Sequence, residues 1–514
     1  MASRREFLTR VGRGMLIAGL GYVTARELNL TPLMAAEESP QRLQFGSQSR
    51  LVDLLQSTPP DQFLPTVVKE IRSGVGLSEL VGATALANAR AFGGEDYIGF
   101  HTFMALRPAL NMADQLPTEQ KALPILKVLY RNAARLHDTE HHTHDTLTPV
   151  AAGDVPNHAD IALRNAVHEQ NRDSGDALLS GLVGRSPEEA WNDLLPTVSE
   201  APEVHRIVLA HRAWDMMGLV GREHAETLLR QSVHYCINVE PHRRKDGMTA
   251  AELAMKVFDE HHLDREASTQ KEVTEDWIEE FANTLLSATP EDAAHAVGAA
   301  LAEGIAPMTI AEAVAVAANQ LVLRDPGRPA EWAQPNKPAG SVHGDSVGVH
   351  ASDTANAWRQ IVAVSNRRNA MASLILAGWG VARDSGVRHY ANFAPRPLAE
   401  QLEGLTTTDP DRLMKELDGA IREQNQERSC AVTQHYLNAG HSAQPVFDLL
   451  LKYACSEDGA LHAEKYFWTV QNEYHTLRPR FRNAQLVALA RVTSSAYGTP
   501  APGVDIAREL LAKS

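Results

Sequence analysis

Hydrophobic residues recur every three or four positions through most of the chain, which is the spacing of an amphipathic α-helix. Clear examples run from Leu77 to Ala89, from Leu301 to Leu321 and from Leu413 to Ile421. Ala, Leu and Glu fill many of the positions between them, and no segment alternates polar and apolar residues over the length of a strand. The pattern therefore predicts an all-α protein.

Proline and glycine divide this helical pattern into segments of a length typical of globular helices. The longest stretch rich in these residues runs from Pro326 to Gly340, and we expect it to form a loop.

Two short motifs occur twice in the chain, in the same order. Ile98-Gly99-Phe100-His101 resembles Val347-Gly348-Val349-His350, and Glu169-Gln170-Asn171 recurs as Glu423-Gln424-Asn425. Repeated motifs in a constant order indicate an internal duplication. The first motif places glycine where a tight turn could present a histidine inward, and the second suggests a hydrogen-bonded network at the contact between the two copies.

The duplication predicts two tandem related halves packed about a pseudo-twofold axis. The first helical half is expected over residues 60–245 and the second over 290–500, joined by a charged connector over 246–289.

The amino terminus carries a signal for export. Ser3-Arg4-Arg5-Glu6-Phe7-Leu8 is followed by the apolar run from Met15 to Ala25 and by small residues at Ala35 and Ala36. Residues 1–36 resemble a twin-arginine signal peptide, which implies transport by the twin-arginine translocase to a periplasmic or other extracytoplasmic location. The apolar run is too short for a stable span, so we expect no stable membrane insertion after signal removal.

Net charge and the cysteine and histidine content indicate which partners and cofactors to expect. The formal net charge of −15 repels phosphate backbones, so nucleic acid is not an expected partner. The three cysteines, Cys236, Cys430 and Cys455, form no Cys-x-x-Cys pair. Histidine is abundant, with 22 residues, and twin-arginine substrates often fold around a cofactor, so a histidine-bound cofactor is expected.

The densest group of candidate ligands lies after a helical segment that ends near Leu136. If that helix continues, His137, His141 and His144 share one face and could bind one metal ion. Asp138 and Glu140 would orient the ligands or act as a base. Imidazole with carboxylate suits iron, zinc or copper. The alternative is a solvated helix end whose histidines interact with the helix dipole.

Other histidines extend this candidate site. His101 and His350 occupy equivalent repeat positions and are predicted to face the substrate or to complete the metal coordination, as catalytic residues. His205 and His211 are candidate cofactor-binding residues, and His462 occupies the corresponding region of the second half. The alternative for each is a hydrogen-bonded structural role.

One competing motif is Gly344-Asp345-Ser346-Val347-Gly348, which resembles the nucleophile elbow of α/β-hydrolases. An elbow needs a buried strand before it, and the preceding residues form only a Pro/Gly-rich segment. A serine hydrolase acting through Ser346 is therefore the third hypothesis.

The sequence resembles two protein families in part. Ala299 to Gly304 followed by Ile310 to Val314 looks like the helical hairpin of carboxymuconolactone decarboxylase and alkylhydroperoxidase-like proteins, without the redox Cys-x-x-Cys of that family. The histidine-rich helical layout is similar to that of questin oxidase-like proteins, although no motif matches residue by residue. These resemblances imply an all-α hairpin and fix no substrate.

The sequence thus favours an exported oxidoreductase that acts on a small-molecule substrate. Its expected cofactor is a transition metal, iron first, or a non-covalent haem. The alternative from another class is a non-enzymatic helical scaffold or binding protein whose histidines are structural.

Overall fold

The computed structural model describes residues 42–243, 247–265 and 270–513, and the predicted signal peptide lies outside them. Within these ranges the chain forms α-helices, short 3-10 turns and three isolated β-bridges, with no strand. The predicted all-α fold class is confirmed.

Side-chain and proline signals begin many of the helices in the first part of the chain. Asp96, Asn171 and Ser186 cap three helices by accepting a backbone N–H, and Pro187 follows its cap at the first helical position. The helices are α2 (Ser49–Ser57), α3 (Pro60–Arg72), α4 (Leu77–Phe92), α5 (Tyr97–Ala113), α6 (Leu123–Leu136), α7 (Ala159–His168), α8 (Arg172–Arg185), α9 (Pro187–Ser199), α10 (Val204–Val220), α11 (Ala225–Val239) and α12 (Ala250–Glu260).

The second part of the chain continues in the same way, with the Pro326 to Gly340 segment forming the expected loop around a single 3-10 turn. Its helices are α13 (Glu275–Ser287), α14 (Pro290–Ala302), α15 (Pro307–Leu323), α16 (Val347–Val364), α17 (Arg367–Arg388), α18 (Ala399–Leu402), α19 (Pro410–Arg422), α20 (Gln426–Asn438), α21 (Gln444–Ser456), α22 (His462–Thr476), α23 (Pro479–Ala496) and α24 (Val504–Ala512).

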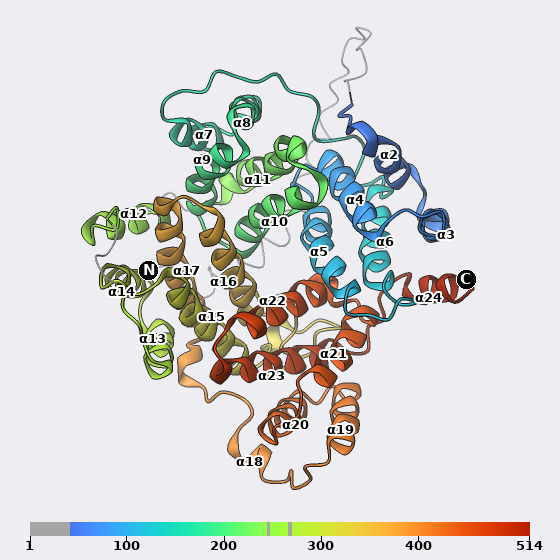
Figure 1. The fold of residues 1–514 in the computed structure, drawn as a ribbon, viewed down its shortest axis with the longest axis vertical. Coiled ribbons are helices and arrows are strands. Elements are labelled where there is room, and N and C mark those ends of the chain that lie inside the picture. Colours follow the sequence, from blue (N-terminus) through green and yellow to red (C-terminus); the bar gives the residue numbers. More distant parts are fainter. Residues whose placement is uncertain (1–41, 244–246, 266–269, 514) are drawn as a thin grey trace.

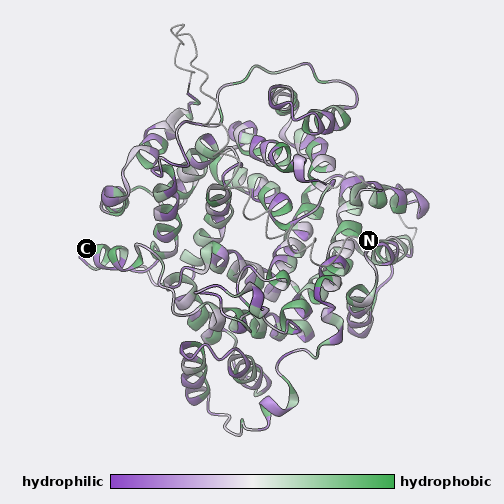
Figure 2. Cartoon of the chain, turned by 180° about the vertical axis from the view of Figure 1, so that it is seen from behind, coloured by the Kyte–Doolittle hydropathy of each residue, from purple (hydrophilic) through white to green (hydrophobic). Residues whose placement is uncertain are grey.

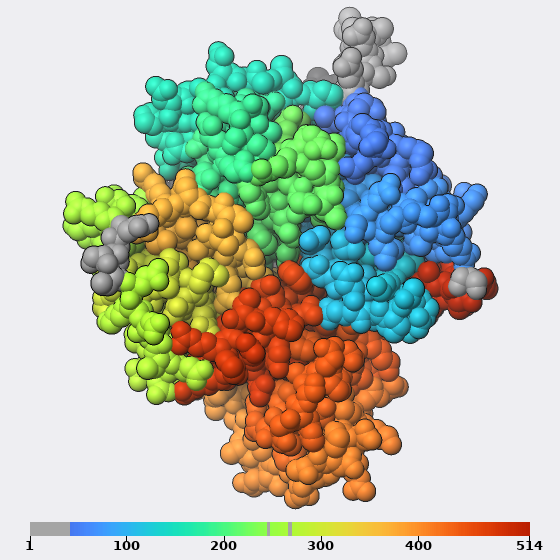
Figure 3. All heavy atoms as spheres, viewed as in Figure 1, coloured from blue at the N-terminus to red at the C-terminus, as the bar shows by residue number. Residues whose placement is uncertain are grey.

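Four helices surround the centre of the molecule. Figure 1 shows α5, α10, α16 and α22 arranged around this centre, and each of them contacts the next, so that they form a closed ring. The remaining helices pack outside this ring, and hydrophilic residues gather on the outward sides of the peripheral helices (Figure 2). Segments far apart in sequence therefore meet at the middle of one face (Figure 3).

The repeated Glu-Gln-Asn motif has the same local role in both places. Gln170 and Gln424 adopt left-handed backbone conformations with φ of 54° and 55°, and the following Asn171 and Asn425 cap α8 and α20. Both motifs are exposed turns between helices. The predicted network at the contact of two copies is therefore wrong, because the motif satisfies local helix ends instead.

The predicted division of the chain stays a prediction. The interval 246–289, expected as a connector, contains α12 and α13. Both helices pack against α17, through apolar residues that include Val257 and Ile278.

None of the helices in the described ranges combines the length and the apolar character that crossing a bilayer requires.

Candidate functional site

Four histidines, one from each central helix, meet inside the ring of helices. The ring centroid of His101 lies 4.7 Å from that of His205 and 5.4 Å from that of His462. His350 closes the circle, at 5.6 Å from His205 and 5.3 Å from His462. His101 and His462 are buried, and the other two are partly buried. We call these four residues the histidine centre.

The beginning of each helix fixes its histidine. In α10 the N-cap Glu203 accepts the backbone N–H groups of His205 and Arg206, and the same carboxylate lies 3.1 Å from Nδ1 of His205. In α5 the Nδ1 of His101 lies 2.7 Å from the carbonyl oxygen of Tyr97. One acceptor thus holds the Nδ1 side of His101 and of His205, which orients the Nε2 of these two rings.

His462 is placed by a strained segment. Ala460 and Leu461, directly before it, both have left-handed backbones, with φ of 48° and 64°. Gly344 packs against the histidine so closely that an added Cβ would lie 2.4 Å from the Cβ of His462. Left-handed non-glycine residues cost energy and concentrate at functional sites, so this local strain supports a functional role for His462.

Gly99 and Gly348 act by allowing close packing, which corrects the predicted tight turn. Both lie inside helices, in α5 and α16. A Cβ on Gly99 would meet the Phe92 side chain at 2.6 Å, and one on Gly348 would meet the backbone of Val322 at 2.6 Å. The absence of a side chain lets neighbouring helices approach.

Several nitrogens of the histidine centre lack partners. The Nε2 atoms of His101 and His205 and the Nδ1 of His462 are buried without a hydrogen bond. The Nε2 atoms of His350 and His462 lie 3.2 Å apart. Buried polar atoms are normally satisfied, so an unpartnered group of this kind requires an explanation.

The surroundings of three of these rings disfavour their charged form. Burial and the nearby Lys465 hold the pKa of His101 and His462 well below the usual range, and burial with His205 lowers the pKa of His350 to about 3. The pKa of Lys465 itself is lowered by burial to about 8. All four rings lie in the first turns of their helices, where the helix dipole also disfavours a cation. Neutral imidazole is the form that binds metals.

One side of the histidine centre faces solvent. Tyr97 is 45% exposed, and its ring centroid lies 4.3 Å from that of His101. The side chain of Glu203 is also partly exposed, and although burial opposes ionisation, His205 lowers its pKa to about 2. Tyr97 and Glu203 therefore lie between the centre and solvent on this side.

The predicted site at His137, His141 and His144 is not assembled. Helix α6 ends at Leu136, so the expected shared helix face is absent. His141 and His144 are exposed, and Nδ1 of each bonds locally, to Asp138 and Thr143. Asp138 also pairs with Arg135 at 2.9 Å, so its carboxylate is engaged locally.

The remaining candidate residues also lie outside the histidine centre. Glu140 is exposed, and its backbone N–H donates to Asp138. His211 is buried in α10, where burial lowers its pKa to about 3, but its ring makes none of the contacts that join the four histidines. In the observed side-chain positions, no group of three His, Cys, Asp or Glu residues could hold a metal ion within residues 42–243, 247–265 and 270–513.

Ser346 has a structural role. It is the N-cap of α16, and its Oγ accepts the N–H of Val349 at 3.4 Å. No strand precedes it within the described ranges, so the strand-to-helix geometry of a nucleophile elbow is missing there.

His234 is a second histidine with a charged environment. It is fully buried in α11, and its two nitrogens lie 2.9 Å from Glu95 and 2.8 Å from Asp176. Although burial opposes it, these hydrogen bonds raise the pKa of His234 above its usual value. With a carboxylate at each nitrogen, the site favours the protonated ring, and His234 joins α8 and α11 to the turn before α5.

The raised pKa predicts how stability depends on pH. The contribution of His234 is complete below its unfolded pKa of about 6.5 and is lost as the pH rises through its higher folded pKa. We expect His234→Gln to lower the free energy of unfolding by about 2 to 4 kcal/mol at pH 6 and by less at pH 8.5. Urea unfolding of both proteins at the two pH values measures this, and a difference that grows with pH would contradict it.

All four histidines were candidates from the sequence, which placed His462 in the region of the second half that corresponds to His205. The sequence did not single out Glu203, beside His205, or Lys465, beside His462. The spacing His462-x-x-Lys465, one helical turn, was the available signal. No family model, curated protein or solved structure matches this chain.

Proposed function

We propose that His101, His205, His350 and His462 bind one transition metal ion, with iron as the first candidate, and that the protein is a metal-dependent oxidoreductase acting on a small molecule. The observation that carries the proposal is the closed circle of four imidazole rings, three of which have a buried nitrogen without a hydrogen-bond partner.

The spacing of the rings is close to what such an ion requires, although as the described side chains stand they do not yet form a complete ligand group. With metal–nitrogen bonds of about 2.0 to 2.1 Å, neighbouring ligand nitrogens lie roughly 3.0 to 3.4 Å apart and neighbouring ring centroids roughly 4.5 to 5.2 Å apart. The 3.2 Å between Nε2 of His350 and Nε2 of His462 falls in the first range. The centroid separations of 4.7 to 5.6 Å lie at or slightly above the second. A small inward shift of the rings would therefore complete the ligand group.

Ligand type and space favour a single ion over haem. Four imidazoles suit iron, copper or zinc, and iron would supply one-electron chemistry at a position open to a small molecule. A haem macrocycle would have to lie between rings whose centroids are only 4.7 to 5.6 Å apart.

The neighbouring side chains have defined tasks. Glu203 orients His205 through its Nδ1 and is itself held by the Tyr235 hydroxyl at 2.8 Å. Tyr97 covers the exposed side of the centre. Lys465 adds positive charge beside neutral ligands, which favours an anionic group on the substrate or on the remaining metal position.

Metal content tests this proposal. The mature protein, purified without a histidine tag, should contain about one ion per chain, and chelation should lower its melting temperature, because an ion bound only by the folded state stabilises that state. A protein with no ion above background and unchanged stability under chelation would contradict the proposal and favour the helical scaffold.

The amino-terminal signal gives a separate prediction about location. We propose that residues 1–36 direct the folded protein through the twin-arginine translocase. Replacing Arg4 and Arg5 with lysine should leave the protein inside the cell with its signal uncleaved, whereas the unchanged chain is exported. Fractionation and intact mass measure this, and export of the double lysine variant at the original level would refute it.

A further inference from the structure

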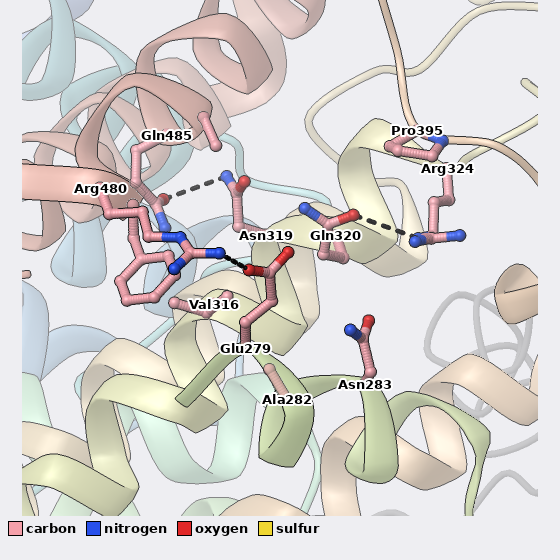
Figure 4. A pocket seen from close by; sticks show the side chains of 12 residues that line it. Glu279, Ala282, Asn283, Val316, Asn319, Gln320, Arg324, Pro395, Arg480 and Gln485 are labelled. Carbon is pink, nitrogen blue, oxygen red and sulfur yellow. Dashed lines mark hydrogen bonds and ion pairs between the residues drawn. The ribbon is translucent and has the colours of Figure 1, made fainter. Parts of the chain in front are cut away.

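A separate pocket lies between α13, α15 and α23 (Figure 4). Its volume is about 270 Å³, close to the lower end of the roughly 300 to 1,000 Å³ of small-molecule sites. None of the four histidines lines it.

One end of the pocket carries an uncompensated cation. The guanidinium of Arg324 is half-buried, and it donates to two neutral acceptors, the side-chain oxygen of Gln320 at 3.1 Å and the carbonyl oxygen of Phe393 at 2.6 Å. Burial lowers the pKa of Arg324, and no carboxylate in the described ranges opposes that effect. A half-buried charge without a counter-charge is costly, and a carboxylate ligand would compensate it.

The opposite end is already neutralised. Arg480 lines the pocket there, and it pairs with Glu279 and with Asp276. Figure 4 shows the Glu279 carboxylate between Arg480 and the pocket interior. Two carboxylates around one arginine disfavour an anion, so this end is suited to a hydrogen-bond donor.

The wall between the two ends is formed by amide side chains and apolar side chains. Asn319 and Gln485 are almost fully buried and bond to each other at 3.1 Å, and the Asn319 side-chain oxygen has no partner. Val316 and Phe481 supply apolar surface beside them. An unsatisfied buried oxygen beside an apolar wall also favours a ligand that carries a donor group.

We propose that this pocket binds a small organic carboxylate, with its carboxylate on Arg324 and a hydroxyl or amino group at the end near Asn319 and Glu279. The site is independent of the metal proposed at the histidine centre. It has the character of a binding site, because the side chains that line it include no unpaired nucleophile.

Calorimetric titration with para-hydroxybenzoate tests the proposal on the mature protein. This probe has a carboxylate and a donor at opposite ends of an apolar ring. We expect saturable binding that weakens at least about tenfold in Arg324→Gln, because a charge-assisted hydrogen bond is lost. The neutral analogue para-hydroxybenzamide should bind more weakly and should not respond to that substitution.

Two further variants test whether the effect is specific to charge inside the pocket. Asn283→Asp adds a carboxylate at an exposed position of the same pocket and should also weaken para-hydroxybenzoate binding by repulsion. Arg482→Gln removes a nearby arginine that bonds to a backbone carbonyl and does not line the pocket, and it should leave the affinity unchanged. Absence of saturable binding, or equal losses in Arg324→Gln and Arg482→Gln, would overturn the proposal.

Discussion

Replacing His205 and His350 together with alanine is expected to abolish stoichiometric metal binding. Both rings belong to the histidine centre, and their nitrogens have few competing partners. Removing two of four proposed ligands should weaken binding by at least about a hundredfold, since the loss of an outer-shell partner alone costs about ten- to a hundredfold. Elemental analysis after dialysis, with the visible spectrum if the ion is iron or copper, measures the change.

The exposed histidine cluster provides the matched control. His141→Ala combined with His144→Ala also removes two imidazoles, from a segment where they bond only to Asp138 and Thr143. That variant should keep its ion. Retention of metal after loss of His205 and His350, or its loss with His141 and His144, would reject the histidine centre as the binding site.

Lys127→Met is expected to lower the free energy of unfolding by about 3 to 5 kcal/mol. Lys127 in α6 and Glu464 in α22 form an ion pair of 2.7 Å with 3% and 0% of their side chains exposed. Lys127 also donates to the carbonyl oxygens of Ala454 and Glu457. The carboxylate accepts no other hydrogen bond, so removing the lysine leaves a buried carboxylate without its ion-pair partner.

A surface pair and a double variant separate this effect from general damage. Lys271 and Glu303 lie at 2.8 Å but are more than half exposed, so Lys271→Met should cost less than about 1 kcal/mol. Adding Glu464→Met to Lys127→Met should cost less than the two single changes combined, by about 1 to 3 kcal/mol. Urea unfolding of the unchanged protein, the three single variants and the double variant measures these free energies. Equal losses for Lys127→Met and Lys271→Met would contradict the expectation.

Local patterns predicted the helices well where the signals were local. The run from Leu413 to Ile421 lies within α19, and the run from Leu77 to Ala89 lies within α4. The run from Leu301 to Leu321 is divided between α14 and α15, because Gly304 takes a left-handed backbone with φ of 86°. Helical spacing continues across such a turn, so periodicity alone could not locate the break.

A high local density of histidines in the sequence was not sufficient to predict a metal site. Four histidines within eight residues after Leu136 suggested a ligand group, but their helical spacing required α6 to continue. The chain leaves the helix there, so that His141 and His144 are exposed while His137 and His142 are partly buried. Shared ligation needs convergence in space, and proximity in sequence does not supply it.

The sequence by itself determined the all-α class, the caps and proline positions that start the helices, and the candidate status of His101, His205 and His350. Those properties depend on neighbouring residues within a few turns of helix. Only the tertiary structure decided that these three rings meet with His462, because the four lie on helices that become neighbours through packing of the whole chain. The same packing buries nitrogens of His101, His205 and His462 without partners and lowers the pKa of His101, His350 and His462.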